Sequence, residues 1–408
     1  MIKESQLLKL IMRKTNQRGK PKVCIISLID LKVDGRTQRQ IKTLRQEGYD
    51  VSIIFHQKMQ QNRGDFDDNV NVKGIKVRSR VLPKCFVFYL IMYLEFCLKA
   101  TYFALRERPD VYQASNLDAL IITYVAGWLR KTPLVYDSRE IYTDMQSVKF
   151  KFLWKVIEAI LLKKVDAIID VNRERAELKK KRYVLSTFPS IVMNCPEICS
   201  PECLDGKTLY EKLAILGLSN KKIVIYQGAI MQGRYLNNLV NAMKYVRSDV
   251  LLIIMGNDHG YSEELKALID DLDIKQRVLF LESIPPSEIV SFVSGADIGI
   301  LFYEKTSLNN YYCAPTKLYE YLMAGLPILV NDLPHLKTMA VEERVGKLLH
   351  EVSPESISCG INEMLESKVE LETMSKRARE IACECYNWAA QAKIYIQIIK
   401  RFVNATSL

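Results

Sequence analysis

Short apolar runs recur along this chain of 408 residues, and segments of helical periodicity separate them. The first run, Val23–Leu28, reads VCIISL, and the Arg36–Glu47 segment after it is predicted to form a helix that ends at Gly48. Further runs in this half are Val51–Phe55, Val111–Gln113, Leu134–Tyr136 and Ala167–Val171. Continuous apolar runs are typical of parallel strands, because helices cover both faces of a parallel sheet. The alternation predicts a doubly wound α/β domain.

A second series of the same kind follows residue 220. Its predicted strands are Ile223–Tyr226, Val250–Met255, Val278–Leu281, Ile298–Phe302 and Ile328–Val330. Between the two series, Val192–Asn220 contains Pro196, Pro201 and Gly206, as expected for a crossing between domains. The chain is also too long for one ordinary core. We therefore expect one domain at residues 1–200 and another at 201–385. The last segment, about 386–408, is expected to complete the first domain as part of a long helix at Ile381–Val403.

Basic residues concentrate in the first half of the chain. Residues 1–200 contain 36 Lys and Arg against 21 Asp and Glu, whereas residues 201–408 contain 22 against 26. The first half therefore carries +15 and the second −4, which agrees with the net charge of +11. A basic half suggests an anionic surface or substrate as partner. No nucleic-acid-binding motif is present, so nucleic acid is not expected as a partner.

Two segments of the first half have a composition suited to a membrane surface. In Lys149–Lys164, KFKFLWKVIEAILLKK, lysines interleave with aromatic and aliphatic residues, which suits either a helix resting on anionic lipid or a core helix with solvated lysines. Phe86–Leu105 matches the roughly 20 residues of a membrane span, but Glu95 and Lys99 favour a buried or membrane-touching helix. Near the start, Lys9 interrupts the apolar residues of Ser5–Lys14, and we expect no secretory signal there.

Cysteine and histidine usage argues against a metal site. The 10 cysteines are scattered without metal-ligand spacing, which suits a reducing compartment with free thiols. Only 4 histidines are present, and they are far apart. We therefore expect neither a metal nor a cofactor.

The segment Tyr311–Asp332 carries the most specific functional signal. Pro315 presets the first turn of a helix, and Gly325 suits the left-handed residue after its end. Within this helix, Lys317 and Glu320 share one face. Backbone N–H groups and a lysine in the first turn of a helix can form a phosphate-binding site. Glu320 would then accept hydrogen bonds from the sugar hydroxyls of a bound nucleotide. A surface ion pair is the alternative interpretation.

Polar loops follow several of the predicted strands. The loop Gln227–Arg234 contains Gly228 and Gly233, which let the backbone approach a phosphate closely. It ends in Arg234, whose guanidinium group can bind a phosphate through two hydrogen bonds. In the first half, Asp30–Arg36, Ala114–Asp118 and Asp137–Asp144 directly follow strands. Ligands of doubly wound sheets bind at such loops.

With these residues placed, the chain resembles the GT-B glycosyltransferases, in particular their large retaining family four, from Lys22 to about Trp388. The most specific match is PTKLYEYLMAGLP at Pro315–Pro327. The resemblance implies two Rossmann-like domains facing across a cleft, an acceptor-binding one first and a donor-binding one second, with the C-terminal helix crossing back. It assigns Arg234 and Lys317 to the donor diphosphate and Glu320 to the ribose. The other implied donor-binding residues are Gly228, Gly233, Tyr312, Pro315 and Thr316.

On the acceptor side the resemblance is weaker. Its candidates are Gly35, Arg36, Asp118, Asp137, Arg139 and Glu140. Arg139 and Asn116 stand where the family pattern has histidines. Tyr312 occupies the position, eight residues before Glu320, of a glutamate that holds the donor sugar in the family, so the donor sugar is not implied.

The resemblance implies a retaining, metal-independent transfer from a nucleotide-diphosphate sugar. The expected acceptor is a lipid-linked or surface polysaccharide at the cytoplasmic face of a membrane, where the protein would be peripheral. Two alternatives stay open. One is a nucleotide-sugar epimerase of the same fold, which the histidine-poor loops disfavour because it needs acid and base groups. The other is a noncatalytic GT-B partner subunit.

Overall fold

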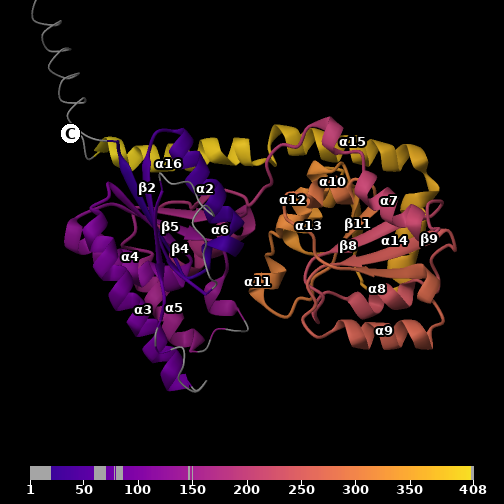
Figure 1. The fold of residues 1–408 in the computed structure, drawn as a ribbon, viewed down its shortest axis with the longest axis horizontal. Coiled ribbons are helices and arrows are strands. Elements are labelled where there is room, and N and C mark those ends of the chain that lie inside the picture. The colour runs from indigo at the N-terminus through magenta and orange to yellow at the C-terminus, as the bar shows by residue number, and fades with distance from the viewer. Residues whose placement is uncertain are drawn as a thin grey trace, which may run out of the picture.

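Two parallel β-sheets organise the chain, one in each half (Figure 1). The computed structural model describes residues 20–58, 70–77, 79, 86–145, 148 and 150–405. The segment Ser5–Lys14 lies outside the described residues, and so does Lys149, the first residue of Lys149–Lys164. The first sheet has the strand order β3-β2-β1-β4-β5-β6-β7, and the second has the order β10-β9-β8-β11-β12-β13.

The first sheet and its helices occupy the N-terminal half of the chain. Its strands are β1 (Lys22–Ser27), β2 (Asp50–His56), β3 (Asn71–Ile75), β4 (Val111–Ser115), β5 (Leu134–Ser138), β6 (Ala167–Asp170) and β7 (Ser190–Ile191). Its helices are α2 (Gly35–Gln46), α3 (Phe86–Glu107), α4 (Leu117–Arg130), α5 (Lys151–Leu161) and α6 (Arg173–Tyr183), with short turns η1 (Leu31–Val33) and η3 (Tyr142–Asp144).

The second sheet follows a linker. Its strands are β8 (Lys222–Gln227), β9 (Val250–Met255), β10 (Val278–Leu281), β11 (Ile298–Leu301), β12 (Ile328–Asn331) and β13 (Gly346–Leu349). The helices are α7 (Lys207–Ile215), α8 (Leu236–Ala242), α9 (Ser262–Asp271), α10 (Ile289–Val293), α11 (Leu308–Tyr311), α12 (Thr316–Met323), α13 (Pro334–Lys337), α14 (Pro354–Glu366), α15 (Lys368–Glu384) and α16 (Trp388–Ala405). Short turns are η4 (Pro201–Cys203), η5 (Lys275–Arg277) and η6 (Thr338–Glu342).

The strand order creates a switch point in each sheet. In the first sheet β1 pairs with both β2 and β4, so the loops after β1 and β4 diverge there. In the second sheet β8 lies between β9 and β11, and the loop Gln227–Arg234, here called the glycine loop, follows β8. Ligands of doubly wound sheets bind at such switch points, outside the carboxyl ends of the strands.

Each face of the first sheet has its own helical layer, because side chains alternate along a strand. Ile26 of β1 packs with the inner residues of α3, α4 and α5, whereas its neighbour Ile25 packs with α2 and α16. Helix α16 crosses back from the second half, as expected (Figure 1). Its Tyr395 hydroxyl donates a hydrogen bond to Gln113 Oε1 at 2.6 Å, and Trp388 Nε1 donates to Thr43 Oγ1 at 2.9 Å.

Most predicted strands agree with the observed ones to within two residues, and the predicted domain limits at 200 and 385 stay predictions. The helix predicted over Ile381–Val403 is wrong as one continuous element, because α15 ends at Glu384 and α16 begins at Trp388. Between them, the Asn387 side chain donates to the carbonyls of Ala382 and Cys383. Among the described residues, no helix combines the length and hydropathy that crossing a bilayer requires.

Candidate active site

Helix α12 lies inside the second domain and is not a surface helix. Pro315 caps it in an extended conformation, and Gly325 follows its end with φ +68°, which favours glycine. Every residue of the helix after Thr316 is buried, including Lys317 (6% exposed) and Glu320 (8% exposed). The alternative interpretation of a surface ion pair is therefore wrong, since both charges are withdrawn from water.

The ammonium group of Lys317 lies among aromatic rings and a second cation. Its Nζ is 4.0 Å from the centroid of the Tyr226 ring and 5.2 Å from that of Tyr303. The Arg234 guanidinium lies over the same Tyr303 ring, at 4.3 Å. Gly228 passes so close that a Cβ there would lie 3.4 Å from Lys317 Nζ, and its φ of +139° also favours glycine. The glycine loop, Arg234 and Lys317 thus converge.

Burial changes the protonation of both charged residues on α12. Burial, and then the neighbouring charge of Arg234, lower the pKa of Lys317 to about 7. Burial raises the pKa of Glu320 to about 7, although the charges of Arg39 and Lys317 oppose this. A cation beside another cation in a dehydrated site is costly, and a bound anion would remove that cost.

A chain of hydrogen bonds reaches this site from the first domain. Arg39 of α2 donates to Asn194 Oδ1 at 2.6 Å, and Asn194 Nδ2 donates to Thr316 Oγ1 at 2.8 Å. Thr316 is the first residue of α12. The first turn of α12 is therefore held by residues from both halves of the chain.

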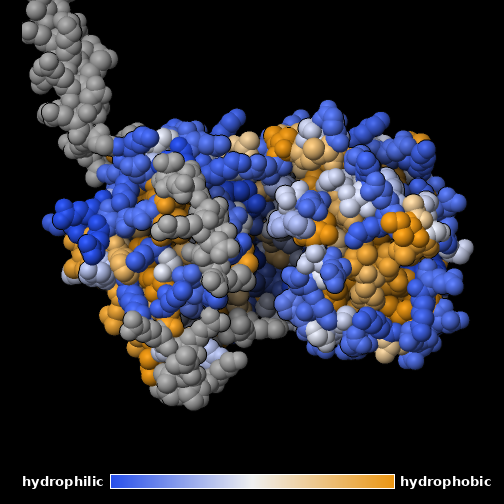
Figure 2. Space-filling model, in the orientation of Figure 1, coloured by the Kyte–Doolittle hydropathy of each residue, from blue (hydrophilic) through white to orange (hydrophobic). Residues whose placement is uncertain are grey.

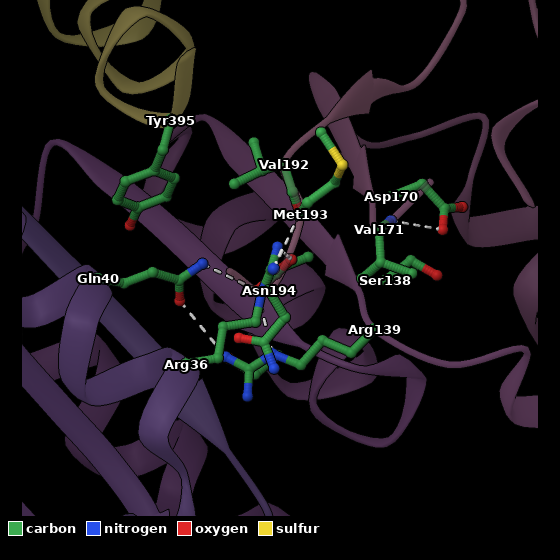
Figure 3. A network of polar contacts seen from close by, with 12 residues as sticks. Arg36, Gln40, Ser138, Arg139, Asp170, Val171, Val192, Met193, Asn194 and Tyr395 are labelled. Carbon is green, nitrogen blue, oxygen red and sulfur yellow. Dashed lines mark hydrogen bonds and ion pairs between the residues drawn. The ribbon is translucent and has the colours of Figure 1, made fainter. Parts of the chain in front are cut away.

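Among the acceptor-side candidates, three belong to one buried ion-pair network, and Figure 3 labels two of them, Arg36 and Arg139. Arg36 Nη2 contacts Asp137 Oδ1 at 2.7 Å, and Arg139 Nη1 contacts Asp34 Oδ1 at 2.7 Å. Arg139 Nε also contacts Asp137 Oδ2, at 3.1 Å. Burial alone would raise the pKa of Asp137, but the two guanidinium groups hold that pKa well below its usual range. Each of these side chains thus has strong internal partners.

The other three acceptor-side candidates lie around this network. Gly35 is the first residue of α2. Asp118 accepts a hydrogen bond from the amide of Ala119 at 3.0 Å, and burial raises its pKa to about 7. Glu140 is partly exposed and lies 3.5 Å from Arg175 Nη1. Acceptor-binding roles for all six residues stay predictions.

Comparison with known proteins identifies the donor-side half of this arrangement. Residues 211–381, which contain the glycine loop and α12, match the family described as glycosyl transferases group 1. This match covers less than half of the 408 residues. Among curated proteins, the chain is similar to two uncharacterized glycosyltransferases of Methanocaldococcus jannaschii, MJ1069 and MJ1607. It is 22% identical to each, over 62% and 44% of its length. The two alignments span 63% and 45% of those relatives.

Solved structures show the fold of this chain. Anabaena Alr3699/HepE, in complex with UDP and glucose, superposes with a TM-score of 0.69 at 14% identity, covering 93% of this chain and all of that one (100%). Sucrose-phosphate synthase from Thermosynechococcus elongatus superposes with a TM-score of 0.74 at 16% identity, covering 95% and 100%. The likeness confirms the GT-B fold.

Tyr312, which departs from the pattern of the family that the sequence resembles, lies at the contact between the two halves of the chain. The backbone carbonyl of Tyr312 accepts hydrogen bonds from Arg175 Nε at 2.7 Å and from Asn172 Nδ2 at 3.2 Å. Arg175 also donates to the carbonyls of Asn309 (3.1 Å) and Arg139 (2.7 Å). This one arginine therefore links the loop after β5 to α11 and to Tyr312, which lie shortly before α12.

Sequence reasoning missed five residues of this site: Arg39, Arg175, Asn194, Tyr226 and Tyr303. Tyr226 and Tyr303 end or follow buried strands beside the glycine loop and α12, and that placement was a usable signal. Nothing in the local pattern marks the other three. In the part of the chain that the structure describes, no group of three or more His, Cys, Asp or Glu is placed to hold a metal ion.

Proposed function

We propose that this protein is a retaining glycosyltransferase that takes its sugar from a nucleotide-diphosphate donor. The observation that carries the proposal is the pair of cations, Arg234 and Lys317, that converge on the glycine loop in a buried site. HepE was solved with UDP and with UDP-glucose, and we propose a donor of that class. Glu320 would accept hydrogen bonds from the ribose, one helical turn deeper.

In the proposed reaction, the bond between the sugar and the diphosphate breaks, and negative charge grows on the leaving diphosphate. Arg234, Lys317 and the first turn of α12 would stabilise this charge where it develops. The acceptor would attack from the same side as the leaving group, so the anomeric configuration is retained. The transfer is proposed to need neither a metal ion nor a side-chain nucleophile.

The proposed acceptor is a lipid-linked or surface polysaccharide at the cytoplasmic face of a membrane. Support comes from the +15 charge of the first half, which contains the acceptor-side loops, because anionic lipid attracts basic surfaces.

A thermal-shift panel of nucleotide-diphosphate sugars tests the donor site. At about a hundred times its dissociation constant, a ligand stabilises by about 2.7 kcal/mol, which a melting curve resolves. The donor that gives the largest shift is then incubated with the protein, and release of nucleoside diphosphate and the anomeric configuration of the product are followed by NMR. Loss of release in Lys317→Ala, but not in Lys337→Ala on the exposed side of α13, is the expected result. Unchanged turnover in Lys317→Ala would contradict the site.

A noncatalytic partner subunit is the second candidate function. Tyr312 supports it, because a tyrosine replaces the carboxylate that holds the donor sugar in the family, and its carbonyl is already bonded to Arg175. Stabilisation by donors with no release of nucleoside diphosphate, with or without candidate acceptors, would favour this function.

A further inference from the structure

Three helices of the first domain expose large apolar side chains to solvent. Helix α4 packs against both α3 and α5, and the inner faces of all three share a core that includes Phe96, Leu120 and Leu161. Their outer faces therefore lie on the side away from the sheet. In Figure 2, hydrophobic residues gather along the left edge of the first domain, where Figure 1 places α3 and α4. The exposed residues are Tyr89, Leu90, Ile91, Leu94, Leu98, Tyr102, Val125, Trp128, Leu129, Phe150, Phe152, Leu153, Val156 and Ile160.

These residues recur at helical spacing. On α3, Leu90, Leu94, Leu98 and Tyr102 follow one another every four residues. On α5, Phe152, Val156 and Ile160 do the same, and all three are exposed. Residues four apart share one face of a helix, so each helix carries an outward apolar stripe in addition to its core face. Apolar stripes on neighbouring helices make a contiguous patch of the kind that marks an interaction surface.

The charges around this patch have one sign. Among the described residues from 86 to 165, every charged side chain that is well exposed is basic, namely Arg106, Arg108, Arg130, Lys131, Lys155, Lys163 and Lys164. The acidic side chains of the same helices have partners inside the protein. Glu95 pairs with Lys99, Glu107 pairs with Lys22, and Glu158 accepts a hydrogen bond from the Tyr183 hydroxyl. An apolar surface with a basic rim is complementary to a bilayer that contains anionic lipid.

A hollow at the edge of the patch suits a lipid headgroup. It has a volume of about 410 Å³, and Trp128, Lys131 and Lys164 line it. Asp166 also lines it, and its carboxylate accepts a hydrogen bond from the amide of Leu134 at 2.8 Å. Tryptophan and lysine together are typical of the interface between lipid and water, where the ring lies at headgroup level and the ammonium meets phosphate.

An aromatic cluster connects the patch to the contact between the domains. The Trp154 ring of α5 lies edge-on to the rings of Tyr93 (5.8 Å) and Tyr142 (5.2 Å). Tyr142 belongs to the turn that also contains Asp144, whose carboxylate accepts a hydrogen bond from the amide of Leu308 in the second domain. A molecule held at the patch is therefore a few side chains away from the acceptor-side loops.

We propose that the outer faces of α3, α4 and α5 form a membrane-docking surface that rests on a bilayer containing anionic lipid. The apolar stripes enter the headgroup boundary, and the basic rim binds lipid phosphates. This orientation presents the acceptor-side loops to the head of a lipid-linked acceptor. The inference deepens the proposed function and rests on it only for the identity of the acceptor, since docking itself does not require catalysis.

Co-sedimentation of the full chain with vesicles tests the surface. The vesicles are phosphatidylcholine, with or without phosphatidylglycerol, and the variant replaces the most exposed residue of each helix with serine: Leu98 (74% exposed), Trp128 (70%) and Phe152 (81%). We expect this triple variant to bind mixed vesicles at least about tenfold more weakly, because each side chain loses its burial in lipid. The matched control replaces Ile215, Val341 and Val369, exposed apolar residues of the second domain, and should bind like the wild type.

A second set of variants tests the basic rim. Replacing Lys131, Lys155, Lys163 and Lys164 with glutamine should weaken binding to the mixed vesicles at least about tenfold and leave binding to pure phosphatidylcholine unchanged. Added salt should have the same effect on the wild type. The matched control replaces four exposed lysines of the second domain, Lys207, Lys266, Lys275 and Lys368.

Failure of the wild type to bind mixed vesicles, or equal binding by the serine variant, overturns the proposal. The wild type could instead form a dimer in sedimentation equilibrium and fail to bind vesicles, with the serine variant monomeric. That result would assign the patch to a second copy of this chain and would also overturn the proposal. Donor turnover is measured separately and without vesicles. A protein that binds vesicles but never releases nucleoside diphosphate refutes the proposed function and leaves the docking surface standing.

Discussion

The Nζ atom of Lys317 lies 4.0 Å from the centroid of the Tyr226 ring, so this buried lysine has an aromatic neighbour where an ion-paired lysine would have a carboxylate. A cation–π contact offsets only part of the cost of dehydrating an ammonium group. Among the neighbouring charges that shift the pKa of Lys317, the largest effect comes from Arg234, which is also positive and lowers this pKa. An anion bound beside Lys317 and Arg234 would therefore offset the cost of placing these two positive charges together.

The first prediction concerns proton uptake on donor binding. Because the pKa of Lys317 is lowered to about 7, a fraction of the free protein at about pH 8 has this lysine neutral, and a bound diphosphate should restore its proton. Donor affinity should therefore fall as pH rises above about 7. Calorimetry of nucleotide-sugar binding, in two buffers of different ionisation enthalpy at about pH 8, measures the proton.

The control for proton uptake separates the two titrating residues of α12. Glu320→Gln should still take up the proton, whereas Lys317→Met should not. Equal proton uptake by wild type and Lys317→Met would assign the proton to another group and contradict the prediction.

The second prediction concerns the stability of the free protein. The pKa of Lys317 in the folded protein, about 7, lies below its ordinary value of 10.5, so burying this lysine lowers the free energy of unfolding. The loss is complete below about pH 7 and becomes smaller as pH rises toward 10.5, the pKa in the unfolded chain. Lys317→Met removes this cost. We expect the variant to melt higher than the wild type at about pH 6, by at most a few kcal/mol of unfolding free energy, and the difference to shrink by about pH 9.5. A variant that melts lower at both pH values would contradict it.

The third prediction concerns the contact between the domains at Arg175. Arg175→Leu leaves the carbonyls of Arg139, Asn309 and Tyr312 without this donor, and hydrogen bonds to charged groups contribute roughly 1.5–3 kcal/mol each. We expect kcat to fall about tenfold or more, since 1.4 kcal/mol corresponds to a factor of about 10. Small-angle X-ray scattering should show a larger radius of gyration.

Arg173→Leu is the matched control for Arg175. Arg173 lies on the same helix, is exposed, and pairs only with Glu177 one turn away among the contacts described. Its replacement should change neither kcat nor the scattering curve. Arg175→Lys should behave like Arg175→Leu, because one ammonium group cannot reach carbonyls on both loops.

The fourth prediction separates a structural from an acceptor-binding role for Arg139. Arg139→Leu leaves Asp34 and Asp137 partly unpaired in a buried site, and breaking such a pair typically costs about 3–5 kcal/mol. Arg139→His, which restores the residue type of the family pattern, should also destabilise, because an imidazole cannot contact both carboxylates. Arg401→Leu on the exposed side of α16 is the control in thermal unfolding. A stable Arg139→Leu variant with impaired acceptor KM would instead support a direct role in acceptor binding.

Much of the fold follows from local pattern. The run VLLIIM predicted β9 to the residue, and Pro315 and Gly325 bracketed α12, because strand burial and helix capping depend on neighbours in the sequence. The break between α15 and α16 was missed for the complementary reason. It depends on the Asn387 side chain bonding to the preceding turn, while the apolar pattern on both sides is helical.

Two parallel sheets, the glycine loop and the position of Lys317 and Glu320 on one face of a helix were predictable from the sequence alone, because periodicity and turn chemistry are local properties. The surroundings of these elements depend on tertiary contacts. Arg139 meets Asp34 across 105 residues, and Arg175 meets Tyr312 across 137. Such contacts form where loops from separate strands reach the same edge of a sheet, and no local pattern encodes which side chains meet there.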